Sequence, residues 1–371
     1  MSLQSKPPKI KVCLVTISLA KGGAERSCAL LTEILFSLGY EVHTAVLNDR
    51  IDFPYKGSLL NLGVEKKTGD SFFKRVGRLK KLRAYLKEKN IDFIIDHRPK
   101  NSYYRELIYH RWVYKGFRTI YVTHSSNKTE YLTQRPEKFA SMCNKNVKNV
   151  AVSNYIEDSV LKEAGVINTI TIHNAFDPSW EEQDEPTHEK LKDKRYILSY
   201  GRIVDNIKDF KFLITSFEES GLWEDEVYLV IMGDGPDKEE IIHFAEQTAS
   251  SKFILFLPFQ NNPFGIIKKA HFVTLTSKYE GFPMVIVESL SQGVPVVSLD
   301  IVSGPNEIIV NEMNGLLIEK RSIPLFAQAM KRMMTEEQLY QRCKDNSRSS
   351  VQKFSMQEIG KKWNNVLSHE A

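Results

Sequence analysis

The sequence predicts an α/β protein made of two doubly wound, parallel-sheet domains. Three observations support this fold class. Apolar strand-like runs alternate with longer helical patterns in both halves of the chain. A polar, proline-containing stretch separates the halves, and the same alternation begins again after it. The length of 371 residues is also too great for one ordinary core and suits two domains.

The first half begins with an apolar run typical of a buried strand, followed at once by a helical pattern. Strands are expected at residues 9–17, 41–47, 91–96, 119–124 and 147–153, and helices at 24–38 and 155–164. Strands separated by helices pair in parallel through crossover connections. This half therefore predicts a Rossmann-like domain over residues 1–177.

The second half repeats the pattern after a linker expected at residues 178–195. Strands are expected at 196–200, 227–232, 253–257, 271–275 and 295–299, with a helix at 285–292 that Gly293 closes. These elements predict a second Rossmann-like domain over residues 196–354. The remaining segment, 355–371, predicts one further helix at about 356–367, which contains Trp363.

The composition indicates which broad class of protein this chain belongs to. With 42% hydrophobic and 26% charged residues, the chain is typical of soluble globular proteins. Its four cysteines have neither metal nor disulfide spacing, which favours reduced thiols. No apolar run approaches the roughly 20 residues of a membrane span, and no signal-like stretch follows the first residues. We therefore expect a cytoplasmic protein that touches a membrane only peripherally.

A basic amphipathic helix is expected between Ser71 and Asn90. Eight Lys and Arg residues oppose a single Glu there, and the apolar residues Phe72, Val76, Leu79, Leu82 and Leu86 recur at helical spacing. One interpretation is a surface helix whose apolar stripe packs on its own domain. The other is contact with an anionic membrane surface or with a diphosphate-linked acceptor. Nucleic acid is not expected, because no stacking or groove-reading motif accompanies the charge.

Two glutamates flank a Gly-Phe-Pro turn after the strand expected at 271–275. Glu280 precedes the turn and Glu288 lies inside the following helix. Open α/β sheets bind ligands at the carboxyl ends of their strands. Pro283 suits a first helical turn, so the amides of Met284 and Val285 would face an anion. Two glutamates at this spacing also occur as solvated carboxylates, but the intervening turn favours a pair that holds one long polyhydroxylated ligand, such as a sugar nucleotide.

This stretch resembles the signature of the retaining glycosyltransferases of family four, among them bacterial enzymes that build lipid-linked or surface glycans. The resemblance covers nearly the whole chain and implies the GT-B fold, in which two Rossmann-like domains face a cleft and the last helix returns to the first domain. It implies that Glu280 contacts the transferred sugar and Glu288 the ribose of the nucleotide. The donor would also contact the turn and helix start, which comprise Gly281, Phe282, Pro283, Met284 and Val285.

Two further motifs match the family's donor site. Gly22 and Gly23 lie between the first strand and its helix, where glycines let the backbone approach a phosphate. Arg202 follows a strand and Gly201, with Lys208 six residues later, and these cations would stabilise the charge that accumulates on a departing diphosphate. Many members have Gly after this Lys, whereas the present chain has Asp209.

The resemblance also assigns side chains to the sugar and the acceptor. His124, at the end of a first-domain strand, would lie beside the transferred sugar, and backbone groups near Phe259 could contact the nucleobase. Acceptor contacts are expected from His97 and Arg98 and from the basic helix. The residues of that helix that we expect to contribute are Lys74, Arg75 and Arg78.

The sequence therefore predicts a retaining glycosyltransferase with a nucleotide-diphosphate sugar, UDP more than GDP, as donor and a glycan or lipid-linked acceptor. The expected transferred group is a hexose or N-acetylhexosamine. The alternatives are an epimerase of the same fold, acting on a nucleotide sugar without an acceptor, and a non-catalytic binding subunit. No metal or other cofactor is expected, since neither metal-ligand spacing nor a convincing Asp-x-Asp pair is present.

Overall fold

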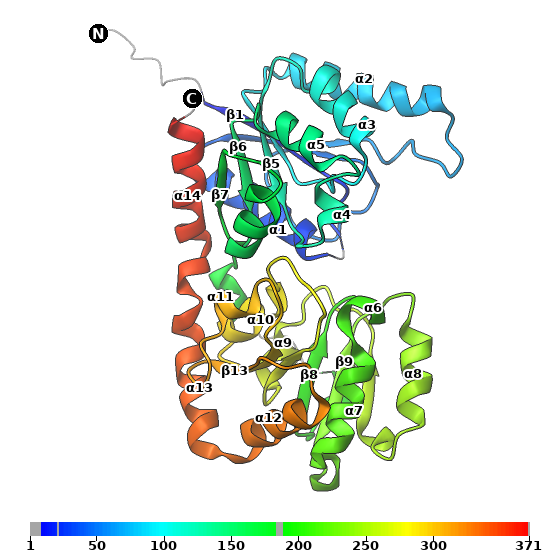
Figure 1. Ribbon diagram of the computed structural model, residues 1–371, viewed down its shortest axis with the longest axis vertical. Helices are drawn as coiled ribbons and strands as arrows, with labels where there is room; N and C mark the ends of the chain where they lie inside the picture. Colours follow the sequence, from blue (N-terminus) through cyan, green and yellow to red (C-terminus); the bar gives the residue numbers. More distant parts are fainter. Residues whose placement is uncertain (1–8, 21, 183–187, 370–371) are drawn as a thin grey trace. The chain divides into compact units, whose positions relative to one another are not determined.

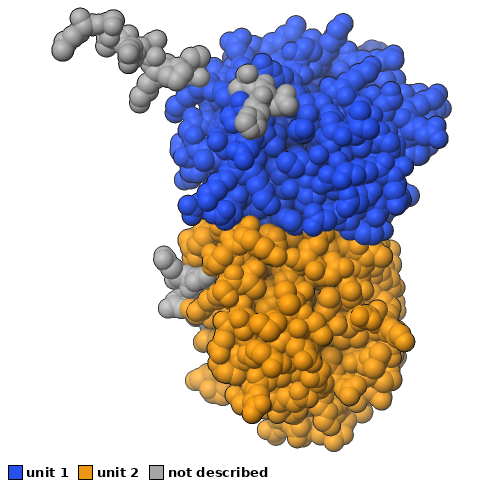
Figure 2. Space-filling model, turned by 60° about the vertical axis from the view of Figure 1, so that its left-hand side comes forward, with its two compact units in different colours: residues 1–175, 356–371 blue, residues 176–355 orange. Residues whose placement is uncertain are grey.

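The computed structural model describes residues 9–20, 22–182 and 188–369. The chain forms two compact units (Figure 2): unit 1 comprises Met1–Ala175 and Met356–Ala371, and unit 2 comprises Phe176–Ser355. Each unit contains one sheet of parallel strands flanked by helices (Figure 1). The two doubly wound parallel-sheet domains predicted from the sequence are confirmed.

The sheet of unit 1 has seven strands in the order β3-β2-β1-β4-β5-β6-β7. Its strands are β1 (Lys11–Thr16), β2 (Glu41–Val46), β3 (Ser58–Asn61), β4 (Phe93–Asp96), β5 (Arg118–Thr123), β6 (Lys148–Ala151) and β7 (Thr169–Thr171). The strand order reverses between β1 and β4, which pair with Val12 opposite Phe93. Such a reversal is the point where open α/β sheets bind ligands.

The helices of unit 1 are α1 (Gly23–Ser37), α2 (Phe72–Glu88), α3 (Tyr103–Ile108), α4 (Lys128–Tyr131), α5 (Pro136–Cys143) and α14 (Met356–His369), with π-helical turns η1 (Tyr109–Val113) and η2 (Ile156–Lys162). The last helix packs against α1 (Figure 1). The Tyr40 hydroxyl lies 2.9 Å from the Asn364 side-chain oxygen, and Gly360 faces Ile34 so closely that a Cβ would lie 3.1 Å away. With Trp363 also buried, α14 is part of the core of unit 1.

The sheet of unit 2 has six strands in the order β10-β9-β8-β11-β12-β13, again with a reversal at its centre, between β8 and β11. Its strands are β8 (Tyr196–Tyr200), β9 (Tyr228–Met232), β10 (Ile254–Leu257), β11 (Val273–Leu275), β12 (Val296–Leu299) and β13 (Gly315–Ile318). The central strands are buried on both faces, which explains their continuous apolar runs.

The helices of unit 2 are α6 (Asp205–Lys208), α7 (Phe210–Ser220), α8 (Lys238–Glu246), α9 (Phe264–Lys269), α10 (Met284–Ser291), α11 (Pro305–Ile308), α12 (Ile323–Thr335) and α13 (Glu337–Ser350). Short 3-10 turns are η3 (Pro178–Glu182), η4 (Glu189–Leu191), η5 (Leu222–Asp225), η6 (Ser251–Phe253) and η7 (Gln352–Phe354). Helices α7 and α12 pack together over the sheet, and Phe210, Phe217, Phe326 and Met330 form much of this core. Two of the short turns, η3 and η4, fall within the expected linker.

Three strands were not predicted from the sequence: β3, β7 and β13. All three are edge strands of three or four residues. Their residues are mostly only partly buried, and none of the three contains more than three large apolar residues in a row. Edge strands are therefore weak in the sequence pattern even where the sheet pairs them regularly.

Candidate functional site

The topology of unit 2 brings two predicted motifs together. The loop with Gly201, Arg202 and Lys208 follows β8, and Glu280 follows β11. These strands are neighbours at the reversal of the sheet, with Leu198 opposite Val273. Both loops therefore emerge at the carboxyl edge of the sheet, where ligands bind in this kind of fold.

Lys208 and Glu280 form the centre of this site. The Lys208 ammonium donates to Glu280 Oε1 at 2.6 Å, and the Ser277 hydroxyl donates to the same oxygen at 2.7 Å. The Lys208 and Glu280 side chains are 19% and 17% exposed, so the pair is partly withdrawn from solvent yet open to a ligand. Lys208 also lies beside Gly201, since a Cβ there would be 3.9 Å from Lys208 Nζ.

Backbone contacts with the end of β11 hold the Lys208 loop. The Thr276 hydroxyl donates to the Lys208 carbonyl at 2.9 Å, and the Lys278 amide donates to the Ile207 carbonyl at 2.7 Å. These bonds fix the loop from the strand that precedes Glu280. A displacement of the Lys208 loop would therefore also displace the segment that carries Glu280.

Arg321, which the sequence reasoning missed, cross-links the same loops. Its guanidinium donates to the carbonyls of Thr276 (3.0 Å) and Ser277 (2.6 Å) and forms an ion pair with Asp209 at 2.6 Å. Arg321 follows β13, the edge strand without a clear sequence signal. A prediction of that strand would have placed a cation at this edge of the sheet.

The backbone conformation of Asp209 explains how an aspartate can stand where many family members have glycine. Its backbone has φ 56° and ψ 52°, the left-handed conformation that favours glycine. Aspartate is one of the few other residues that adopt it at modest cost. Because its carboxylate also pairs with Arg321, the aspartate retains the loop shape and adds a contact that glycine lacks.

The Gly201-Arg202 turn rests on the turn after β9. A Cβ on Gly233 would lie 1.9 Å from the Gly201 carbonyl oxygen, and one on Gly235 would lie 2.0 Å from that of Ile203. Both positions therefore require glycine. Arg202 is exposed and its side chain has no hydrogen bond or ion pair with any described residue, which leaves its guanidinium available to a ligand.

The Gly-Phe-Pro turn is also held by a neighbouring loop. The Ser303 hydroxyl donates to the Gly281 carbonyl at 2.8 Å, and a Cβ on Gly304 would lie 2.3 Å from Pro283 Cδ. The Phe282 ring is buried against Phe354, with centroids 5.1 Å apart. Only backbone groups of Phe282 are therefore suited to contact a donor.

Helix α10 begins at Met284, and Pro283 is its N-cap rather than part of its first turn as expected. The amides of Met284 and Val285 lie in the first turn, where helical N–H groups lack partners within the helix. Deeper in the helix, Glu288 is 4% exposed and accepts a hydrogen bond of 2.9 Å from the Tyr200 hydroxyl. Tyr200, the last residue of β8, was not expected to take part.

Phe259 follows β10 at the same edge of the sheet. Its amide donates to Asp234 Oδ2 at 3.2 Å, so this N–H is already used within unit 2. The Asp234 carboxylate thereby ties the turn after β9 to the segment after β10.

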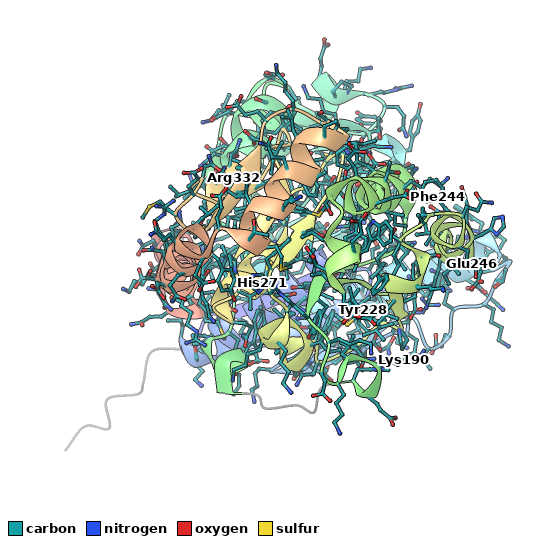
Figure 3. All side chains as sticks on the ribbon, turned by 90° about the horizontal axis from the view of Figure 1, so that it is seen from below. Lys190, Tyr228, Phe244, Glu246, His271 and Arg332 are labelled. Carbon is teal, nitrogen blue, oxygen red and sulfur yellow. The ribbon has the colours of Figure 1, made fainter. Side chains whose placement is uncertain are left out.

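The opposite edge of this sheet is shown in Figure 3, where Tyr228 lies at the start of β9. His271 lies there too and stacks on Tyr340 with centroids 4.0 Å apart. Burial lowers the pKa of His271 to about 4. This histidine is a neutral packing residue that precedes β11, at the end of the strand opposite the carboxyl edge.

In unit 1, Gly22 and Gly23 begin α1 after β1. Gly22 is the N-cap in an extended conformation, and a Cβ there would meet the end of the flexible Glu25 side chain, 2.0 Å from its Oε2, so glycine keeps this position open without being required by the backbone. Lys21, which precedes the two glycines, lies outside the described residues. The turn places the N-terminus of α1 at the carboxyl edge of the sheet, a position where helix amides can bind an anion.

His97 and His124 follow the paired strands β4 and β5 and contact each other directly. His97 Nδ1 and His124 Nε2 are 2.9 Å apart, and the rings stack with centroids 5.1 Å apart. Burial lowers the pKa of His97 to about 3 and that of His124 well below its usual value. Both rings are therefore neutral at physiological pH and share one proton in this bond.

The outer nitrogens of the pair, His97 Nε2 and His124 Nδ1, are buried without a hydrogen-bond partner among the described residues. A cavity of about 10 Å³ borders His97 and is also lined by Ser27 and Asn174. This is room for about one water molecule. The sequence predicted roles for both histidines but not their pairing.

The expectation that Arg98 contacts an acceptor is corrected by the structure. Its guanidinium is 1% exposed, donates to Asp96 at 2.5 to 3.1 Å and to Glu106 at 3.1 Å, and lies 3.4 Å from the Tyr109 ring centroid. The cations of Arg98 and Lys100 outweigh the effect of burial and hold the pKa of Asp96 below its usual range. A buried charge of this kind must be paired, so Arg98 is structural.

The basic residues of α2 lie apart from the histidine pair in the hydrogen-bond network. Lys74 and Arg78 pair with Asp70, which precedes the N-cap Ser71, and Arg75 has no ion pair among the described residues. Within the described ranges, no bond joins these three side chains to His97 or His124.

Two general findings concern metals and membranes. Within the part of the chain that the structure describes, no group of three or more His, Cys, Asp or Glu side chains could hold a metal ion. Among the described helices, none is both long enough and apolar enough to cross a bilayer.

Two family models match the chain in succession. The model described as Glycosyltransferase Family 4 matches residues 21–180, and the model described as Glycosyl transferases group 1 matches residues 181–350. Among known proteins, the chain is similar to N-acetylgalactosamine-N,N'-diacetylbacillosaminyl-diphospho-undecaprenol 4-alpha-N-acetylgalactosaminyltransferase of Campylobacter jejuni. The two are 26% identical over 377 aligned residues, which cover 95% of this chain and 97% of that protein.

Solved structures share the fold at lower identity. Anabaena HepE in complex with UDP and glucose superposes with a TM-score of 0.78 at 18% identity, covering 97% of this chain and 100% of that one. A mutant of S. aureus TarM in complex with fondaparinux, α-GlcNAc-glycerol and UDP has a TM-score of 0.75 at 15% identity, covering 96% of this chain and 99% of that one.

Proposed function

The chain belongs to the family-four glycosyltransferases of the GT-B fold, and from this premise we propose that it transfers a hexosyl or N-acetylhexosaminyl group from a UDP-sugar, with retention, to a glycan or lipid-linked acceptor. The observation that most supports this proposal is the Lys208–Glu280 pair at the strand reversal of unit 2. A cation and a carboxylate side by side suit a ligand with a diphosphate next to a sugar.

In this proposal unit 2 holds the donor. Arg202, Lys208 and the amides of Met284 and Val285 bind the diphosphate, and in unit 1 the glycines Gly22 and Gly23 give a phosphate access to the backbone. Glu280 binds hydroxyls of the sugar, and Glu288, oriented by Tyr200, binds the ribose. Positive charge opposite the phosphates lowers the barrier because negative charge accumulates there as the glycosidic bond breaks.

The proposed reaction is a front-face substitution. The bond between the anomeric carbon and the diphosphate oxygen breaks, and the bond to the acceptor oxygen forms on the same face of the sugar. The acceptor hydroxyl gives its proton to the departing phosphate oxygen, so charge and atoms balance without an enzyme nucleophile. Arg202 and Lys208 take the part that a divalent cation would otherwise play, and we propose no metal cofactor.

In this proposal unit 1 binds the acceptor, and His124 contacts a sugar hydroxyl. A neutral His124 can orient a hydroxyl through a hydrogen bond but carries no charge. A lipid-linked acceptor is supported by the Campylobacter relative, whose name specifies a diphospho-undecaprenol substrate. We accordingly propose a cytoplasmic enzyme that acts at the inner face of the cell membrane, with Lys74, Arg75 and Arg78 near the acceptor's phosphates.

A thermal-shift comparison of UDP, GDP, ADP and their sugars tests the donor assignment. A nucleotide at 100 times its dissociation constant should stabilise the protein by about 2.7 kcal/mol, which corresponds to roughly 5 to 11 °C for a domain of this size. UDP and its sugars should give this shift. The proposal fails if none of the three nucleotides does, and release of an altered nucleotide sugar without any acceptor would identify an epimerase instead.

A further inference from the structure

Two phenylalanines at the start of α2 lie on the surface of unit 1. Phe72 and Phe73 are 72% and 83% exposed, and their rings meet edge to face with centroids 6.1 Å apart. Of the apolar stripe expected along this helix, Leu82 and Leu86 are buried, and both lie in its second half. Helix α2, at the margin of unit 1 (Figure 1), is thus anchored by that half and presents an aromatic tip to solvent.

Unpaired lysines share a face of the helix with this tip. Phe73, Lys80 and Lys87 are seven residues apart, which is close to two full turns at about 3.6 residues per turn, so their side chains lie along one line. All three are exposed. Neither lysine forms an ion pair with any described residue.

The basic residues of α2 that pair with acidic residues lie along a different face of the helix. Lys74, Arg78 and Lys81 are spaced by four and three residues and therefore project together. Lys74 and Arg78 pair with Asp70, and Lys81 pairs with Glu65 at 3.1 Å. The charges of Lys80 and Lys87 therefore remain unpaired on the side of the helix that carries the two rings.

We infer that the face of α2 formed by Phe72, Phe73, Lys80 and Lys87 docks on an anionic lipid bilayer. The rings enter the boundary between headgroups and acyl chains, and the ammonium groups remain at the level of the lipid phosphates. A bilayer matches both features at once, since exposed rings gain by leaving water and the lysines meet complementary charge. This inference extends the proposed function, because docking brings the chain to a lipid-linked acceptor.

The test measures co-sedimentation of the full chain with vesicles of equal parts phosphatidylcholine and phosphatidylglycerol, without donor or acceptor. One variant combines Phe72→Ser with Phe73→Ser, and a second combines Lys80→Gln with Lys87→Gln. The matched controls lie elsewhere on unit 1: Ile167→Ser, which is 82% exposed, and Lys138→Gln with Lys145→Gln, both exposed.

Loss of both rings should weaken vesicle binding by at least about 100-fold, on the basis of about tenfold or more per buried ring. Loss of both lysines should weaken it about 25-fold, from about fivefold per charge, and reduce its salt dependence. The controls should bind like the unchanged chain. A further readout is Phe72→Trp, whose fluorescence should be quenched by lipids brominated in their acyl chains.

Binding of the phenylalanine variant within twofold of the Ile167→Ser control would overturn the inference. It would also be overturned if the chain alone formed a dimer that the phenylalanine variant abolished, since the face would then be a contact between copies. UDP affinity, measured separately by calorimetry, should be unchanged in every variant. A failure of the unchanged chain to bind UDP would count against the proposed function, but it would not affect the conclusion drawn from vesicle binding.

Discussion

Replacing Lys208 by alanine is the most direct test of the unit 2 site. The lysine ammonium lies 2.6 Å from Glu280 Oε1, and both side chains are less than one-fifth exposed. The substitution removes a cation from the diphosphate position and leaves the carboxylate with its Ser277 contact. Removal of one such charge-stabilising donor costs roughly 10² to 10³ in turnover, or about 2.7 to 4 kcal/mol of transition-state stabilisation.

The same change should leave the fold intact. A hydrogen bond between charged groups contributes about 1.5 to 3 kcal/mol to the free energy of unfolding. At roughly 2 to 4 °C per kcal/mol for a unit of this size, Tm should fall by roughly 3 to 12 °C. Lys211→Ala is the matched control, because the Lys211 side chain makes surface contacts, an ion pair with Glu240 and a cation–π contact with Phe244, whose loss should change Tm little.

The assay is UDP release from a UDP-sugar at 25 °C, with kcat and KM determined separately. Lys208→Ala and Arg202→Ala should both lose turnover, Lys208→Arg should recover part of it, and Lys211→Ala should match the unchanged chain. If Lys208→Ala and Arg202→Ala both kept turnover within threefold of the unchanged chain, the diphosphate assignment would be wrong.

Three further predictions follow from individual contacts. Glu280→Gln should spare the affinity for free UDP, whereas Glu288→Gln should weaken it; calorimetry that finds equal losses would show that the roles are divided wrongly. Asp209→Gly should be about 1 kcal/mol more stable than Asp209→Ala, because alanine is strained in the left-handed conformation, and equal denaturation midpoints would contradict this. The pKa of His97 is about 3 in the folded chain, so below pH 6.5 only the unfolded chain takes up this proton and stability should fall by about 1.4 kcal/mol per pH unit. His97→Phe should lessen this loss in denaturant titrations between pH 7 and pH 5, and an unchanged slope would refute the assignment.

The sequence alone determined the class of fold and the chemistry of the main motifs. Apolar runs and helical periodicity are local properties, so they located the central strands and most long helices. The Gly-Phe-Pro turn with its two glutamates is likewise local, and it identified the family before any contact was known. Edge strands such as β13 were not predicted because an apolar run within a four-residue strand is too short to be distinctive.

The tertiary structure decided which of these side chains meet. Lys208 and Glu280 are 72 residues apart, and Arg321 and Asp209 are 112 apart; each pair is joined only because the strand order brings their loops to one edge of the sheet. Burial also separated two neighbours with similar sequence signals, since His97 meets His124 whereas Arg98 is enclosed by Asp96 and Glu106. Phe72 and Leu82 belong to one apolar stripe by their spacing, but Phe72 is exposed and Leu82 is buried. Such differences depend on what packs against a residue from distant parts of the chain, which the spacing of residues does not encode.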